Sequence, residues 1–156
     1  MHIRKYHPGE ERELWQLFFA TIHNVNIRDY TAEQVRAWAP EQIDEQLWRE
    51  RIRSMNPYVC VVDNQIAGYA GLLPTGYIDH FYVHHQRQGQ GVGKLLYAAI
   101  EAEARDRHVD ELTADVSITA RPFFTARGFT VVVPQEVARG KSVLRNFKMV
   151  KQLNDD

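Results

Sequence analysis

The sequence predicts an α/β fold built on a mixed β-sheet of about six or seven strands, with helices on both faces. Apolar residues recur at helical spacing near the N-terminus and again after residue 91, whereas residues 58–83 read as short strands joined by turns. A three-stranded meander followed by alternating helices and strands requires both parallel and antiparallel pairing. The 156 residues suit a single domain, 1–156.

The N-terminal third is predicted to be mainly helical. A short strand over residues 2–6 comes first, and the spacing of apolar residues then predicts helices over residues 10–25, 31–40 and 43–55. Thr31 and Gln34 form the T-x-x-Q pattern of a capping box at the start of the second helix. Pro40 ends that helix, and Pro57 ends the third.

The rest of the chain alternates between strands and helices. Strands are expected over residues 58–63, 66–73, 77–83, 111–116, 129–133 and 143–151, and helices over residues 91–108 and 120–127. Asp63 and Asn64 form the first hairpin turn, and Gly128 provides a typical C-terminal helix stop.

Composition excludes several classes of protein. Hydrophobic residues make up 44% and charged residues 25%, as in ordinary globular proteins, and the net charge of −1 gives no basic footprint for nucleic acid. The single cysteine, Cys60, excludes a disulfide framework and a cysteine-rich zinc site. Because Cys60 lies in the apolar run YVCVV, we expect an inert buried thiol.

The N-terminal segment MHIRKYHPGEERE lacks the apolar core of a signal peptide. No apolar run approaches the roughly 20 residues of a membrane span. We therefore expect a cytoplasmic protein with no nucleic-acid or membrane partner.

Three alternating glycines, Gly89, Gly91 and Gly93, precede a segment that is otherwise predicted to be helical. Each glycine inside a helix costs about 1 kcal/mol, so the position requires exposed backbone. A strand, a glycine-rich turn and a helix N-terminus form an anion site. The P-loop pattern fails at Gln88 and Leu95, and the dinucleotide fingerprint fails because Lys94 occupies its third glycine position.

The segment QGQGVG (residues 88–93) instead matches the pattern [QR]-x-x-G-x-[GA], with which the chain resembles the GNAT superfamily of N-acetyltransferases. The later ARPFFTARGF is similar to the A-x-x-x-Y-x-x-x-G-F segment of that family, with Ala120, Gly128 and Phe129 in place. The resemblance covers nearly the whole chain. It implies a GNAT-like sheet splayed between its fourth and fifth strands.

The resemblance also implies acetyl-CoA as co-substrate. Its pyrophosphate is expected on main-chain N–H groups of the glycine turn, and its pantetheine arm along the strand that ends at Val83. The expected cofactor-binding residues are Phe81, Tyr82, Val83, Gln88, Gly89, Gln90, Gly91, Val92, Gly93, Lys94, Ser117 and Phe124. For Ser117, helix capping is an equal alternative, since Ser117, Ile118 and Thr119 precede a helix.

Asp79 is the first candidate for the base that deprotonates the amine, because the resemblance places an acidic residue four positions before Val83. His80 is the second, with an ordinary pKa near 6.5, although strand alternation directs it to the opposite face. Phe124 stands where the family has a proton-donating tyrosine, so Tyr77, Tyr82 or water would have to supply that proton.

No metal is expected. His84 and His85 are adjacent, and adjacent strand residues point to opposite faces, which makes them a poor chelating pair.

The leading hypothesis is an acetyl-CoA-dependent N-acetyltransferase that acts on a primary amine of a small molecule, peptide or protein by direct attack, as a monomer or homodimer. The alternative is a non-catalytic acyl-CoA-binding module with the same fold. Nucleotide binding is a third hypothesis, and the two failed motifs argue against it. The sequence does not identify the acceptor amine.

Overall fold

The computed structural model describes residues 1–153 of the protein. Its elements are β1 (His2–Lys5), α1 (Glu11–Asn24), the 3₁₀ turn η1 (Asn26–Arg28), α2 (Ala32–Trp38), α3 (Glu45–Met55), β2 (Tyr58–Val62), β3 (Gln65–Leu72), β4 (Tyr77–Val83), α4 (Val92–Asp106), β5 (Glu111–Ser117), α5 (Arg121–Ala126), β6 (Thr130–Arg139) and β7 (Ser142–Gln152). The predicted order of strands and helices is confirmed. Within these residues no helix has both the length and the apolar character that crossing a membrane requires.

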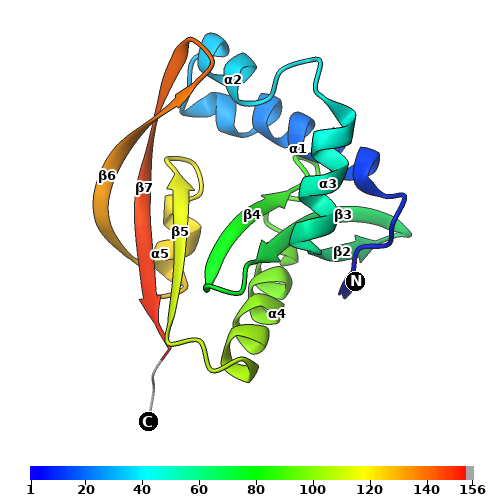
Figure 1. Ribbon diagram of the computed structural model, residues 1–156, viewed down its shortest axis with the longest axis vertical. Coiled ribbons are helices and arrows are strands. Elements are labelled where there is room, and N and C mark those ends of the chain that lie inside the picture. The colour runs from blue at the N-terminus through cyan, green and yellow to red at the C-terminus, as the bar shows by residue number, and fades with distance from the viewer. Residues whose placement is uncertain (154–156) are drawn as a thin grey trace.

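The strands form one seven-stranded sheet in the order β1-β2-β3-β4-β5-β7-β6. Strands β4 and β5 pair in parallel, and the other neighbouring pairs are antiparallel. The prediction of a mixed sheet is therefore confirmed. Figure 1 shows the sheet as two halves, β1–β4 and β5–β7, with β4 and β5 facing each other where the halves meet.

The two halves are joined by a short stretch of backbone pairing. In the described chain, Tyr77 pairs with Thr113 and Ile78 with Ala114, and beyond these residues β4 and β5 separate. The predicted splay between the fourth and fifth strands is confirmed. From Asp79 onward, the edge of β4 that faces β5 has no strand partner among residues 1–153.

Apolar side chains form one cluster on each face of the sheet. Leu96 and Ile100 of α4 are fully buried on one face, and Leu14 of α1 and Ile52 of α3 on the other. Each such side chain contributes about 1.5–3 kcal/mol through burial. Cys60 is also buried in the core, as predicted, and burial raises the pKa of its thiol.

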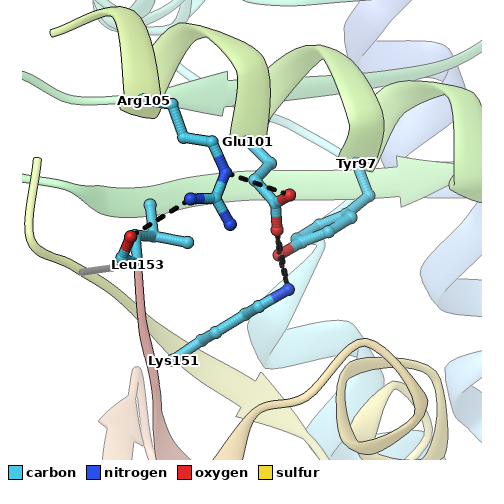
Figure 2. A network of polar contacts seen from close by, with 5 residues as sticks. All are labelled: Tyr97, Glu101, Arg105, Lys151 and Leu153. Atoms are coloured by element: carbon cyan, nitrogen blue, oxygen red, sulfur yellow. Dashed lines mark hydrogen bonds and ion pairs between the residues drawn. The ribbon is translucent and has the colours of Figure 1, made fainter. Parts of the chain in front are cut away.

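Helix α4 also connects the two halves of the sheet through polar contacts. Toward β7, the Glu101 carboxylate accepts hydrogen bonds from the Tyr97 hydroxyl at 2.7 Å and from Lys151 Nζ at 2.6 Å (Figure 2). Toward β1, the Glu103 carboxylate lies 3.3 Å from Lys5 Nζ. Helix α4 is therefore linked by ion pairs to both halves of the sheet, to β7 on one side and to β1 on the other.

Local capping signals position the helices on the N-terminal side. The predicted capping box forms, because Thr31 Oγ1 accepts from the Gln34 N–H at 3.1 Å and Gln34 Oε1 accepts from the Thr31 N–H at 2.9 Å. The third helix begins at Glu45 rather than at Ile43, because the Asp44 side chain caps it. Such a cap contributes about 1 kcal/mol.

Candidate active site

The turn between β4 and α4 carries two glycines in the left-handed region. Gly89 has φ +71° and Gly91 has φ +88°, and an added Cβ at either position would meet nothing within 4 Å. Gly91 directly precedes the first residue of α4. Residues with a side chain adopt these φ values at a cost, so glycine suits both positions.

The main-chain N–H groups of this turn are not used by the fold. In the described chain, no protein acceptor takes a hydrogen bond from the N–H of any residue from Gln88 to Lys94, whereas the next N–H, of Leu95, donates to the Gly91 carbonyl. The Gln88 side chain steadies the turn by donating to the Val83 carbonyl at 2.8 Å. Unpaired N–H groups at the start of a 15-residue helix favour an anion.

The structure gives a second reason for glycine at position 93. It lies within α4, and an added Cβ would come within 3.0 Å of the Phe123 ring of α5. Its lack of a side chain therefore permits α5 to pack closely on the head of α4. This packing role adds to the predicted one, exposure of the backbone N–H, which stays a prediction for Gly93.

A hollow of about 130 Å³ runs from the glycine turn along β4, and we call it the channel. It is lined by Thr21, Val25, Asn26, Phe81, Tyr82, Val83, Gln88, Gly93, Ser117, Thr119, Ala120 and Phe123. Six of the residues predicted to bind the cofactor line it. Of the remaining six, Gly89, Gln90 and Gly91 lie in the glycine turn, and Lys94 lies in the first helical turn of α4. The side chains of Val92 and Phe124 are buried in the core.

Phe124 packs in the core near the splay. It is 3% exposed, with ring centroids 5.4 Å from Phe81 and 5.1 Å from Phe129. It also borders a slot of about 60 Å³ between the separating strands β4 and β5. Its ring contributes apolar surface there and has no proton to donate.

A third hollow, of about 200 Å³, lies beyond the slot, and we call it the polar cavity. Its walls include Phe18, Tyr30, Trp38, Arg51, Tyr77, Asp79, His80, Tyr82, Asp115, Ser117, Val137, Arg139, Leu144, Arg145 and Asn146. Tyr82 and Ser117 line the channel, the slot and the polar cavity alike, so the three hollows adjoin at these two residues. A molecule in the channel and one in the polar cavity can therefore meet there.

The two predicted bases line the same polar cavity. Ala70 pairs with Phe81 and Leu72 with Ile78, so one residue of β3 faces Asp79 and His80 together. Two residues opposite one form a β-bulge, which interrupts strand alternation. The prediction that His80 points away from the face of Asp79 is therefore wrong.

The His80 side chain is buried, and its contacts with Tyr69 and Phe18 are to uncharged groups. Its Nδ1 and the Tyr69 hydroxyl are hydrogen-bonded at 2.9 Å, and its ring stacks on Phe18 at 5.5 Å between centroids. Burial, assisted by the charge of Arg51, lowers the pKa of His80 to about 4. Such an imidazole is a weak proton acceptor at neutral pH.

Asp79 is held by an ion pair at the wall of the cavity. Its Oδ1 lies 3.0 Å from Arg51 NH2 of α3, and its side chain is 16% exposed. The carboxylate thus lies at the edge of the hollow, whereas His80 is buried, and this makes Asp79 the better placed of the two candidate bases.

The structure also shows what each candidate proton donor contacts. The Tyr77 hydroxyl donates to Asp115 at 2.9 Å, and burial followed by this hydrogen bond raises the pKa of Tyr77. Burial also raises the pKa of Tyr82. Ser117 Oγ accepts hydrogen bonds from Ala120 N–H at 3.0 Å and from Asn26 Nδ2 at 3.4 Å, which leaves its own hydrogen available to donate.

Sequence reasoning missed four charged residues of the polar cavity: Arg51, Asp115, Arg139 and Arg145. The strand predicted as FTVVV continues to Arg139, and this extension brings Gln135 Nε2 within 2.7 Å of Asp115 Oδ1. The alternation of polar and apolar residues from Glu111 to Ser117 was the one available signal, since it places Asp115 on a polar face of β5.

His84 and His85 follow β4 rather than belonging to it, and their rings stack at 4.4 Å between centroids. Their predicted separation onto opposite faces is wrong, because the strand has ended. Residues 1–153 contain no group of three or more His, Cys, Asp or Glu side chains placed to hold a metal ion.

Comparison with known proteins identifies the family. The family described as "Acetyltransferase (GNAT) domain" matches residues 26–153. The chain is 33% identical over 150 residues to "Uncharacterized N-acetyltransferase YafP" of Escherichia coli (strain K12), covering 96% of this chain and 94% of the relative.

Solved structures agree in fold. A "GCN5-Related N-acetyltransferase: Aminotransferase, Class-II" from Rhodopseudomonas palustris superposes with a TM-score of 0.94 at 31% identity, covering 97% of this chain and 95% of the other. The yncA protein of Salmonella typhimurium, described as a putative acetyltransferase with its cofactor acetyl-CoA, has a TM-score of 0.72 at 18% identity, covering 100% and 95%. The chain belongs to the GNAT acetyltransferase family, and it is an acyltransferase enzyme.

Proposed function

We propose that residues 1–156 form one N-acetyltransferase domain, which moves the acetyl group of acetyl-CoA to a primary amine by direct attack. The observation that carries the proposal is the row of unpaired N–H groups from Gln88 to Lys94, at the head of α4 and beside the splayed sheet. The acetyl-CoA bound by the structural relative yncA supports the choice of donor.

In this proposal the cofactor lies along the channel. Its diphosphate accepts hydrogen bonds from the N–H groups of the glycine turn, and Lys94 adds a positive charge. Its pantetheine arm lies beside the unpaired edge of β4 from Phe81 to Val83, where no strand of the described chain competes for the backbone groups. The thioester then lies near Tyr82 and Ser117, where the three hollows adjoin.

The acceptor amine approaches from the polar cavity. Its ammonium form loses a proton to the Asp79 carboxylate, directly or through a water, and the free amine attacks the acetyl carbon. A backbone N–H of the Phe81–Val83 strand stabilises the oxyanion. The C–N bond forms, the C–S bond breaks, and CoA leaves as a thiolate. The proton that the attacking nitrogen still has to lose passes through water to this thiolate, which the Ser117 hydroxyl can stabilise by donating a hydrogen bond.

The test is release of free CoA thiol from acetyl-CoA over a panel of primary amines, together with a binding measurement. Gly91→Glu should abolish acetyl-CoA binding by steric block and charge repulsion. Gly140→Glu is the matched control, because Gly140 also has positive φ (+57°) and nothing within 4 Å, but lies in the β6–β7 turn.

Unchanged acetyl-CoA affinity in Gly91→Glu would refute the proposed cofactor site. Tight acetyl-CoA binding without thiol release for any amine would instead refute transfer to a primary amine.

A further inference from the structure

Two charged side chains on the walls of the polar cavity, Asp115 of β5 and Arg139 of β6, have no charged partner in the described chain. Asp115 accepts hydrogen bonds from two neutral groups, the Tyr77 hydroxyl at 2.9 Å and Gln135 Nε2 at 2.7 Å. In the described chain no cation pairs with Asp115 and no carboxylate pairs with Arg139, whose NH1 donates to the adjacent Ala138 carbonyl. By contrast, Arg51 and Asp79 of the same walls pair with each other.

The register of the β6–β7 hairpin places Arg139 on the cavity side. Gln135 pairs with Asn146 and Val137 with Leu144, and these residues alternate with Glu136, which pairs with Arg145. Gln135, Val137 and Arg139 therefore share the face that reaches Asp115. Arg145 also borders the cavity, although strand alternation directs its side chain to the face opposite Arg139.

Asp115, on β5, and Arg139 lie at different points along the length of β6. Gln135 donates a hydrogen bond to Asp115, and the Cα atoms of Gln135 and Arg139, which are four residues apart on one strand, are separated by roughly 13 Å. Aromatic side chains, among them Tyr30, Trp38 and Tyr82, line the cavity as well. The surface thus offers a negative end, an apolar wall and a positive end.

We propose that the acceptor is a small amine that carries a carboxylate several bonds from its amino group, as an ω-amino acid or a short peptide does. The amino end lies toward Asp115 and Asp79, and the carboxylate pairs with Arg139. An unpaired guanidinium disfavours a second ammonium, so polycationic amines bind less well. This inference rests on the proposed acetyl transfer, because it names the amine that the reaction uses.

The test compares three amines of one chain length, 6-aminohexanoate, hexylamine and 1,6-diaminohexane, with 4-aminobutyrate and 8-aminooctanoate added to vary the length. Thiol release gives kcat/KM for each, and calorimetry on the CoA-loaded protein gives affinity. A guanidinium–carboxylate contact should favour the best amino acid over the simple amine by roughly ten- to hundredfold. The diamine should be no better than hexylamine.

Two variants of the β6–β7 hairpin locate the preference. Arg139→Gln should bring the ratio of kcat/KM between the amino acid and hexylamine close to one. Lys141→Gln removes one positive charge from the same hairpin at an exposed position outside the cavity walls, and it should keep that ratio.

The inference is overturned if the unsubstituted protein has a kcat/KM for hexylamine or the diamine that equals or exceeds its kcat/KM for the best amino acid. Acetyl transfer would stand in that case. An unchanged ratio in Arg139→Gln overturns it as well. Selective binding of amino acids without thiol release supports the inference and refutes the transfer, and no binding of any amine refutes the inference.

Discussion

Replacing Glu101 by glutamine tests how the two halves of the splayed sheet are held together. The Glu101 carboxylate accepts from the Tyr97 hydroxyl at 2.7 Å and from Lys151 Nζ at 2.6 Å, with side chains 25% exposed for Glu101 and 21% for Lys151. Hydrogen bonds to charged groups contribute about 1.5–3 kcal/mol each, and glutamine retains part of them. We therefore expect Glu101→Gln to lower the free energy of unfolding by about 1–2 kcal/mol at pH 7, and Tm by roughly 3–6 °C.

The effect should depend on pH with a definite sign. Burial opposes ionisation of Glu101, but hydrogen bonds from Lys151 and Tyr97 outweigh it, and the pKa of Glu101 is lowered. Its stabilising contribution is complete above the unfolded carboxyl pKa of about 4.3 and is lost as the pH falls through the lower folded value. The difference between the two proteins should therefore shrink below pH ~4.

Urea unfolding at pH 7 and at pH 3 measures both effects. Glu45→Gln is the matched control, because Glu45 is 57% exposed and pairs loosely with Arg12 at 3.6 Å and Arg49 at 3.7 Å. That control should lose less than about 0.5 kcal/mol. Equal losses in the two variants, or a Glu101→Gln deficit that persists at pH 3, would refute the bracing role of Glu101.

Three further predictions concern single residues. Asp79→Asn should lower turnover at pH 7 by about a hundredfold or more with acetyl-CoA affinity unchanged, as steady-state kinetics and calorimetry would show, and full activity would remove it as the base. The unsubstituted protein should lose stability as the pH falls from about 6.5 toward the lowered His80 pKa of about 4, since the unfolded chain binds that proton more readily. His80→Gln, which keeps a partner for Tyr69, should flatten this dependence in urea titrations, and an identical slope would contradict the assignment. Gly93→Val should cost about 1–3 kcal/mol by crowding the Phe123 ring, and Phe123→Leu in the same chain should recover part of it in thermal unfolding, whereas no recovery would place the strain elsewhere.

Much of the fold could be predicted because its signals are local. The Thr31–Gln34 capping box, the hairpin turn at Asp63 and Asn64, where both residues have positive φ, and the Gly128 helix stop each depend on a few consecutive residues. The order of strands and helices followed from such signals, and the glycine turn followed from its spacing. Caps, turns and helix stops can be predicted from a sequence because the groups that form them are neighbours along the chain.

The contents of the polar cavity were decided by tertiary structure. Arg51 and Asp79 are 28 positions apart, and Gln135 and Asp115 are 20 positions apart, so only the folded sheet brings them together. The side of the sheet on which His80 lies depends on a β-bulge, and a bulge is a property of two paired strands rather than of one. The sequence by itself determined the glycine turn that is typical of the family and the helix α4 that follows it. The packing of distant segments determined which charges face the acceptor, because electrostatic complementarity depends on distance in space and not along the chain.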